Sequence, residues 1–97
     1  MNVAQSILSQ LGGKRFCAMT GASQFVASDN MLKFKIGRGA TNKATNVRVT
    51  LDESDTYTVE FFSIRGVNVK KITSHEMVYA DQLCSVFTAQ TGMDVSL

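Results

Sequence analysis

Three segments of the chain alternate between apolar and polar residues, and this period of two constrains the fold more than any other feature of the sequence. The segments lie at residues 31–36, 47–51 and 57–61. Successive side chains of a β-strand point to opposite faces of a sheet, so the alternation indicates strands with one buried face. The apolar positions are Leu32, Phe34 and Ile36, then Val47, Val49 and Leu51, and finally Tyr57, Val59 and Phe61.

The two ends of the chain have instead the period of an amphipathic helix. The first expected helix ends at Gly12-Gly13, because glycine takes the left-handed conformation that closes a helix. The second is expected over residues 78–90 and is closed by Gly92. The apolar positions are Val3, Ile7, Leu8 and Leu11 in the first helix, and Tyr79, Ala80, Leu83, Cys84, Val86 and Phe87 in the second.

Two further strands are expected, at residues 14–19 and at residues 67–72 after a tight turn at Arg65-Gly66. Residues 52–55 indicate a hairpin loop, and residues 37–46 have no apolar period and indicate a basic, mobile loop. Short connections favour antiparallel neighbours. The expected fold is therefore α+β: an antiparallel sheet of four to five strands with an N-terminal and a C-terminal helix covering one face, in the order α-β-β-β-β-β-α.

Chain length and composition limit the class of protein. The 97 residues are expected to form a single α+β domain, residues 1–97, because chains of about 50–200 residues build one core. With 44% hydrophobic residues and no run of about 18 apolar ones, intrinsic disorder and a membrane span are excluded. The N-terminus lacks the pattern of a signal peptide, and two cysteines are too few for a disulfide framework. We therefore expect a cytoplasmic protein.

No group of residues has the spacing that catalysis or metal binding requires. His75 is the only histidine, and with Cys17 and Cys84 it does not approach the ligand spacing of a zinc site. Cys84 lies on the apolar stripe of the second helix, where a thiol is unreactive, and His75 is expected to be solvated near the start of that helix. The acidic cluster at 52–55 suits a turn, and Gly37-x-Gly39 is only a fragment of a phosphate loop. We expect no enzyme activity, no catalytic or metal site and no cofactor.

The alternating strands also predict which residues lie opposite each other. Pairing Val49 with Val59 brings two of the hydrophobic runs into register. Arg48 then falls opposite Glu60, which makes a favourable cross-strand pair. Carried through the expected two-residue turn, the next hairpin places Glu60 opposite Lys71.

The same register places Phe62 opposite Val69 and gathers apolar residues on the face away from Phe61. Two explanations fit. A β-bulge near Phe61-Phe62, or a longer turn, could return these residues to the core. Otherwise they form an apolar patch that marks an interaction surface, covered by a partner or by a second copy of the chain. The candidate interface residues are Phe62, Ile64, Val67 and Val69.

The net charge of +2 hides an uneven distribution of charge. Residues 1–50 carry seven basic residues and one acidic residue, whereas residues 51–97 carry three basic and seven acidic residues. Opposite poles could steer a protein partner or pair two copies head to tail. Part of the positive charge belongs to one strand–loop–strand unit, which is either a solvated face or a site for an anionic partner. The candidate residues are Lys33, Lys35, Arg38, Lys43 and Arg48.

Four segments spread through helix, strand and turn carry a resemblance: NVAQSILSQLGG at residues 2–13, FCAMTGA at 16–22, YTVEFF at 57–62 and YADQL at 79–83. Together they resemble a family of small proteins found in bacteriophages and other mobile elements of bacteria. The resemblance spans nearly the whole chain and implies an accessory or host-takeover protein of the host bacterial cytoplasm. It implies no activity, cofactor or site.

These observations favour a non-enzymatic binding protein. A protein partner, including a second copy of the chain, is the first expectation, because of the apolar second face and the separated charges. A nucleic acid bound by the basic strand–loop–strand region 33–48 is the alternative. We expect no membrane and no small-molecule cofactor among the partners.

Overall fold

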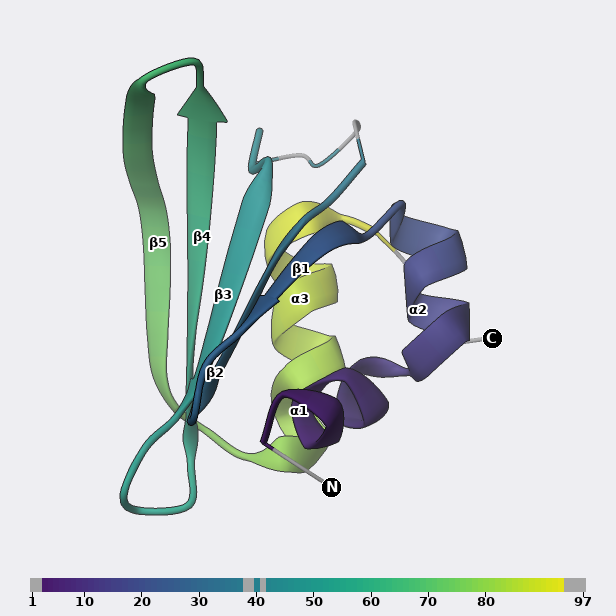
Figure 1. The fold of residues 1–97 in the computed structure, drawn as a ribbon, viewed down its shortest axis with the longest axis vertical. Coiled ribbons are helices and arrows are strands. Elements are labelled where there is room, and N and C mark those ends of the chain that lie inside the picture. The colour runs from purple at the N-terminus through teal and green to yellow at the C-terminus, as the bar shows by residue number, and fades with distance from the viewer. Residues whose placement is uncertain (1–2, 38–39, 41, 94–97) are drawn as a thin grey trace.

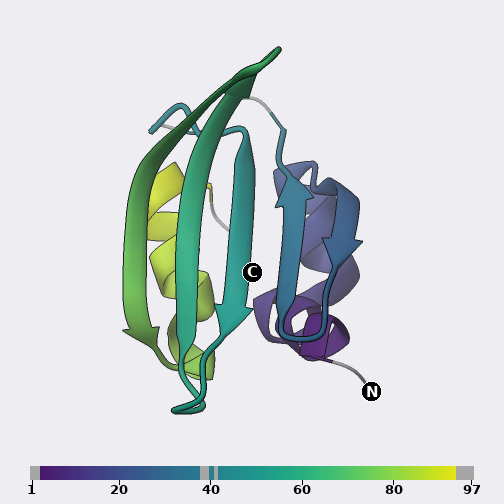
Figure 2. The ribbon, with the colours of Figure 1, turned by 60° about the vertical axis from the view of Figure 1, so that its left-hand side comes forward.

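The described part of the chain forms a five-stranded antiparallel sheet with its helices on one face (Figure 1). The computed structural model describes residues 3–37, 40 and 42–93 of the 97. The strands lie in chain order, each hydrogen-bonded to the next, so the sheet is a simple meander (Figure 2). The α+β class and the antiparallel sheet flanked by terminal helices are as the sequence predicts. The elements are α1 (Val3–Leu11), α2 (Gly13–Thr20), β1 (Ser23–Ala27), β2 (Met31–Lys35), β3 (Asn46–Leu51), β4 (Tyr57–Arg65), β5 (Asn68–Val78), the 3-10 helix η1 (Ala80–Gln82) and α3 (Leu83–Thr91).

Strands β3 and β4 have the predicted register, and β2 pairs with β3 so that the buried faces coincide. Val49 pairs with Leu32 on one side and with Val59 on the other, and all three side chains are buried. Arg48 lies opposite Glu60, as expected. The face that packs on the helices therefore carries the buried apolar residues at alternate positions, and the residues between them point away from it. These buried residues are Leu32, Phe34, Val47, Val49, Val59 and Phe61.

Four phenylalanine side chains join the sheet to two of the helices. Phe16 of α2 meets Phe34 of β2 at a centroid distance of 5.5 Å and Phe87 of α3 at 5.0 Å, both edge to face. Phe87 in turn lies 6.3 Å from Phe61 of β4. All four rings are at most 1% exposed. Edge-to-face contacts add to the hydrophobic gain of burial, so this cluster fixes α2 and α3 against the sheet.

Residues 14–19 form most of α2, and the predicted strand there is wrong. Gly12 and Gly13, with φ of 125° and 60°, bend the chain from α1 into a second helix. Phe16 and Thr20, one helical turn apart, are its buried residues, and the Thr20 hydroxyl donates to the Phe16 carbonyl at 2.7 Å. The segment has no alternation, and helical spacing is what brings Phe16 into the core.

The edge strand β1 has no sequence signal, because all five of its residues are exposed. It follows α2 through a close approach of two glycines. Gly21 has φ of 70°, and a Cβ added there would lie 3.1 Å from the Cα of Gly37. The Gly37 amide donates to the Thr20 carbonyl at 2.7 Å. These contacts tie the end of α2 to the chain that leaves β2, and glycine permits both the conformation and the approach.

The β4–β5 hairpin differs from the prediction in its turn and its register. The turn is Gly66-Val67, so Arg65 lies opposite Asn68. Phe62 consequently pairs with Lys71, and Glu60 pairs with Ser74. The predicted pairings of Phe62 with Val69 and of Glu60 with Lys71 are wrong. The positive φ of 60° at Gly66 explains the shift, because a tight hairpin needs such a residue at its first turn position.

Strand β5 is longer than predicted and ends at Val78. The last helix therefore starts later than expected, as η1 followed by α3, and Gly92 closes it with φ of 73°. In the predicted basic loop, β3 already begins at Asn46. Residues 38, 39 and 41 of that loop, Arg38 among them, lie outside the described residues.

Candidate binding face of the sheet

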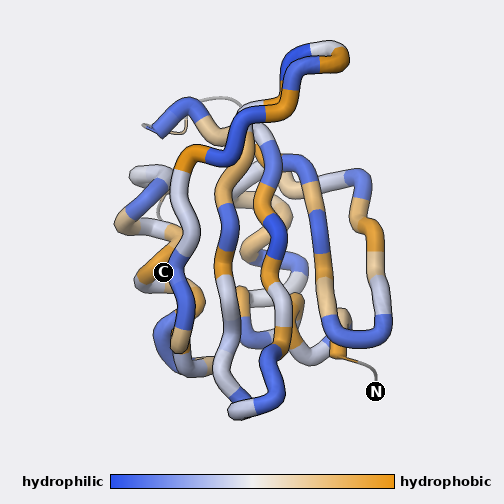
Figure 3. Tube along the Cα trace, turned by 90° about the vertical axis from the view of Figure 1, so that its left-hand side faces the viewer, coloured by the Kyte–Doolittle hydropathy of each residue, from blue (hydrophilic) through white to orange (hydrophobic). Residues whose placement is uncertain are grey.

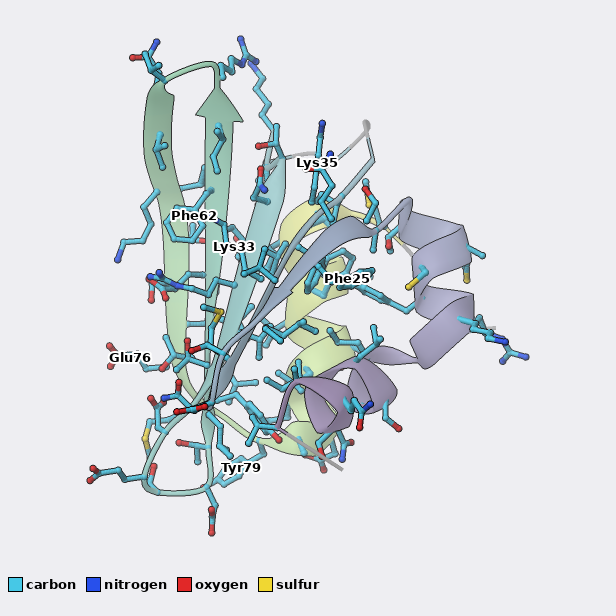
Figure 4. All side chains as sticks on the ribbon, in the orientation of Figure 1. Phe25, Lys33, Lys35, Phe62, Glu76 and Tyr79 are labelled. Atoms are coloured by element: carbon cyan, nitrogen blue, oxygen red, sulfur yellow. The ribbon has the colours of Figure 1, made fainter. Side chains whose placement is uncertain are left out.

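The sheet face turned away from the helices carries the basic residues of β2 and β3 together with an aromatic ring. Lys33 pairs with Arg48, which pairs with Glu60, so the three side chains form a row across β2, β3 and β4. In a second row, Lys35 pairs with Asn46 and Asn46 with Phe62, which pairs with Lys71. Lys33 and Phe62 lie on the side away from the helices in Figure 4. We call the following set the basic face: Lys33, Lys35, Arg48, Glu60, Phe62 and Lys71.

Two cations of the basic face hold its one carboxylate. The Arg48 Nη2 and Nε atoms lie 2.8 and 2.9 Å from Glu60 Oε1, and the Lys71 Nζ lies 3.3 Å from Oε2. The Glu60 side chain is only 11% exposed, whereas those of Arg48 and Lys71 are 40% and 53% exposed. The negative charge of Glu60 is thus compensated by Arg48 and Lys71, whose own side chains remain accessible to solvent.

Phe62 is the aromatic side chain of the basic face. The Arg48 guanidinium carbon lies 5.2 Å from its ring centroid, within the range of a cation–π contact. The predicted bulge near Phe61-Phe62 is present, yet Phe62 stays outside the core. The reason is that the extra residue is Ile72 on β5 and not a residue of β4, so the side chains of β4 keep their alternation.

The other apolar candidates lie on the protruding end of the β4–β5 hairpin. Ile64 is half-buried, while Val69 is 63% and Val67 97% exposed. Figure 3 shows this hairpin rising beyond the neighbouring strands. The structure therefore contains both the bulge and the exposed apolar residues that the sequence analysis offered as alternatives.

A pocket of about 490 Å³ opens at the end of the sheet where β2 and β4 finish. Three of its lining residues are basic: Lys35 at the end of β2, Lys43 in the following loop and Arg65 at the end of β4. Lys35 and Lys43 were predicted for an anion site, and the pocket brings them together. Arg65 was missed, because only the loop conformation places it beside them. The remaining lining residues are Ile36, Gly37, Ala44, Thr45 and Ile64.

Acidic residues gather at the opposite end of the sheet. The β1–β2 and β3–β4 connections and the segment after β5 all lie at the lower end in Figure 1. The pocket, with its three cations, lies at the upper end, where the β2–β3 connection begins. Charges of opposite sign are thus separated in space, although Asp29 and Arg65 do not belong to the half of the chain that carries most charges of their sign. The acidic residues of the lower end are Asp29, Asp52, Glu53, Asp55 and Asp81.

Within the described residues, no group of three or more His, Cys, Asp or Glu side chains could hold a metal ion. His75 is not solvated as predicted. It is half-buried on β5 against Phe61, with ring centroids 6.2 Å apart. The His75 Nε2 atom is buried and has no hydrogen-bond partner among the described residues.

Cys84 is half-buried, and its thiol donates to the Leu11 carbonyl at 3.3 Å. Burial raises the pKa of the Cys84 thiol, which keeps it protonated and unreactive.

No family model, no curated protein and no solved structure matches this chain. The resemblance to proteins of phages and mobile elements therefore stays a prediction. Over the described ranges, none of the helices is both long enough and apolar enough to cross a membrane.

Proposed function

We propose that this chain is a non-enzymatic binding protein and that its basic face binds single-stranded nucleic acid. The observation that carries the proposal is the position of Phe62 among Lys33, Lys35, Arg48 and Lys71, with Glu60 already neutralised. Proteins that bind single strands without sequence preference combine cations that follow the phosphates with aromatic rings on which bases stack. We place the protein in the host bacterial cytoplasm, on the strength of the resemblance alone.

The shape of the face supports a single strand over a duplex. The described elements offer no helix that projects from the outer side of the sheet to enter a groove. Phe62 is half-buried on the open face of the sheet, and only unpaired bases present their faces to such a ring. An open sheet face suits splayed bases, as in other sheet-based binders of RNA.

The charge of the face argues against a second copy of the chain on the same surface. Two basic faces packed together would bring Lys33 and Lys35 of one copy against the cations of the other. Like charges placed opposite each other disfavour association. This is why we now prefer nucleic acid to self-association for the basic face, although the sequence alone favours a protein partner.

The proposal is tested by fluorescence anisotropy with labelled single-stranded DNA and RNA over a series of salt concentrations. If three or four cations contact phosphates, the slope of log K against log salt should lie between about −2 and −3. Phe62→Leu keeps an apolar side chain but removes the ring, and should weaken binding about tenfold. Lys33→Glu should weaken binding and reduce the slope.

Lys14→Glu is the matched control, because it makes the same charge change at an exposed position of α2. It should bind nearly as well as the wild type. Thermal unfolding checks that all variants fold. The proposal fails if no binding is found at low salt, or if Phe62→Leu and Lys33→Glu bind like Lys14→Glu.

A second candidate function rests on the tip of the β4–β5 hairpin. The exposure of Val67 and Val69 favours a protein contact there, and a second copy of the chain is the simplest partner. Sedimentation equilibrium would then show association that increases with concentration, and Val69→Asp would give a folded monomer. If the wild-type chain stays monomeric at high concentration, self-association through the tip is refuted.

A further inference from the structure

We infer that the pocket lined by Lys35, Lys43 and Arg65 binds the terminal phosphate of a nucleic acid strand. This inference rests on the proposed function, because it gives the strand on the basic face a place to end. The pocket has a volume of about 490 Å³, which lies within the range of about 300–1,000 Å³ for small-ligand sites. It therefore has room for a phosphate together with the nucleotide that carries it.

The walls of the pocket are fixed by hydrogen bonds of the backbone. The Ile36 amide donates to the Thr45 carbonyl at 2.9 Å, and the Ala44 amide donates to Asn42 Oδ1 at 3.1 Å. The Ile64 amide donates to Thr45 Oγ1 at 2.8 Å. The amides of Gly37, Lys43 and Thr45 also have backbone acceptors. Because these six lining amides are already paired, the cationic side chains are the groups best placed to hold an anion.

Lys43 has an unusual backbone conformation. Its φ is 63°, in the left-handed region that lysine seldom occupies. The Lys43 amide donates to the Ala40 carbonyl at 3.0 Å, and the bond from the Ala44 amide to Asn42 closes the same turn. A strained residue that neighbouring bonds hold in place is often found where a ligand is bound. Lys43 is one of four described non-glycine residues with a positive φ, and it lines the pocket with Lys35 and Arg65.

Charge favours a terminal phosphate over an internal one. The three lining cations come from separate segments, and no carboxylate is among the described residues that line the pocket. A phosphate monoester carries about −1.5 to −2 charge at pH 7, whereas each internal diester carries a single charge. Three cations around one pocket therefore match the end of a strand better than its middle.

The pocket is continuous with the basic face. Lys35 belongs to both, and the Thr45 amide donates to the Phe62 carbonyl at 2.8 Å. Ile64 follows Phe62 by two residues on β4 and lines the pocket together with Ile36 and Ala44. This apolar lining can take the sugar or base of the terminal nucleotide while the cations take its phosphate. A strand stacked on Phe62 can thus end in the pocket without leaving the protein surface.

The test compares oligothymidines of roughly eight nucleotides that carry a 5′-phosphate, a 3′-phosphate or no terminal phosphate. One phosphorylated form should bind about tenfold more tightly than the unphosphorylated form. Arg65→Gln and Lys43→Asn should remove this preference and leave the affinity for the unphosphorylated strand nearly unchanged. Asparagine is chosen because it tolerates the left-handed conformation.

Lys70→Gln is the control, because Lys70 belongs to the same hairpin but is not among the residues that line this pocket. It should keep the preference. If oligothymidine binds without any preference for a terminal phosphate, or if both pocket variants keep it, the inference is overturned and the proposed function stands. Thymidine monophosphate is titrated separately. If it binds better than thymidine while no oligonucleotide binds, the proposed function fails and the pocket is still an anion site.

Discussion

Neutralising Glu60 should make the protein less stable and a stronger binder of nucleic acid. In the Glu60→Gln variant, Arg48 and Lys71 lose the carboxylate that lies 2.8 and 3.3 Å from them. Exposed pairs contribute about 0.2–1 kcal/mol each and fully buried ones more, so losing both should cost about 1–2 kcal/mol. In a domain of this size, that loss lowers the midpoint of thermal unfolding by about 5–10 °C.

The same substitution releases two cations toward a bound strand. If each then meets a phosphate, the slope of log K against log salt should steepen by about 0.7 per added contact. Stability is measured by thermal unfolding and binding by anisotropy with single-stranded DNA. Glu76→Gln is the control, because it removes one negative charge at an exposed position of β5 that lies on the same side of the sheet, below Lys33 and Phe62 (Figure 4). The reasoning is refuted if Glu60→Gln weakens binding, or if Glu76→Gln raises the affinity and the slope equally.

Three further predictions concern the fold. Phe16→Ala should lower the free energy of unfolding by about 3–5 kcal/mol in chemical denaturation, since it opens the centre of the aromatic cluster; a loss below 1 kcal/mol would contradict the assigned helix α2. Gly21→Ala should cost about 1–3 kcal/mol, because of its φ of 70° and the backbone 3.1 Å from the new Cβ, whereas Gly66→Ala meets only the φ penalty and should cost less. Burial raises the pKa of the Cys84 thiol in the folded chain above its ordinary value of 9.0. The buried neutral thiol therefore favours the folded state fully below pH 9.0, and this stabilisation is lost as the pH rises through the folded pKa. Iodoacetamide should therefore alkylate Cys84 more slowly in the folded chain than in urea, and equal rates would contradict the raised pKa.

The alternating strands could be predicted because the residues that become buried recur at every second position of the sequence. Val47, Val49 and Val59 are each at most 2% exposed, and they occupy the positions that the pattern selects. Strand β1 could not be predicted, since it lies at the sheet edge with every residue exposed and so has no such pattern. The segment around Phe16 was misread because α2 is short and buries only Phe16 and the polar Thr20, which leaves too few apolar positions to reveal the helical period.

The candidate site divides in the same way. Lys33, Lys35 and Arg48 could be grouped from the sequence because strand alternation decides which face they share. The position of Phe62 depended on whether the bulge falls on β4 or on β5, and no local signal separates these cases. Arg65 meets Lys43 at the pocket because hydrogen bonds of the described residues around Lys43 fix their conformation, and these bonds follow no repeating pattern in the sequence.

The placement of charge gives the proposed binding face a direction. Acidic residues such as Asp52 and Glu53 occupy one end of the sheet, and they would repel a phosphate backbone that extended past the lower ends of the strands. The cations of the basic face and of the pocket attract the backbone toward the other end. A strand on this face is therefore favoured to lie over the upper part of the sheet, with one terminus at the pocket. The near-neutral net charge of +2 conceals this arrangement, because cations at one end and carboxylates at the other nearly cancel in the sum.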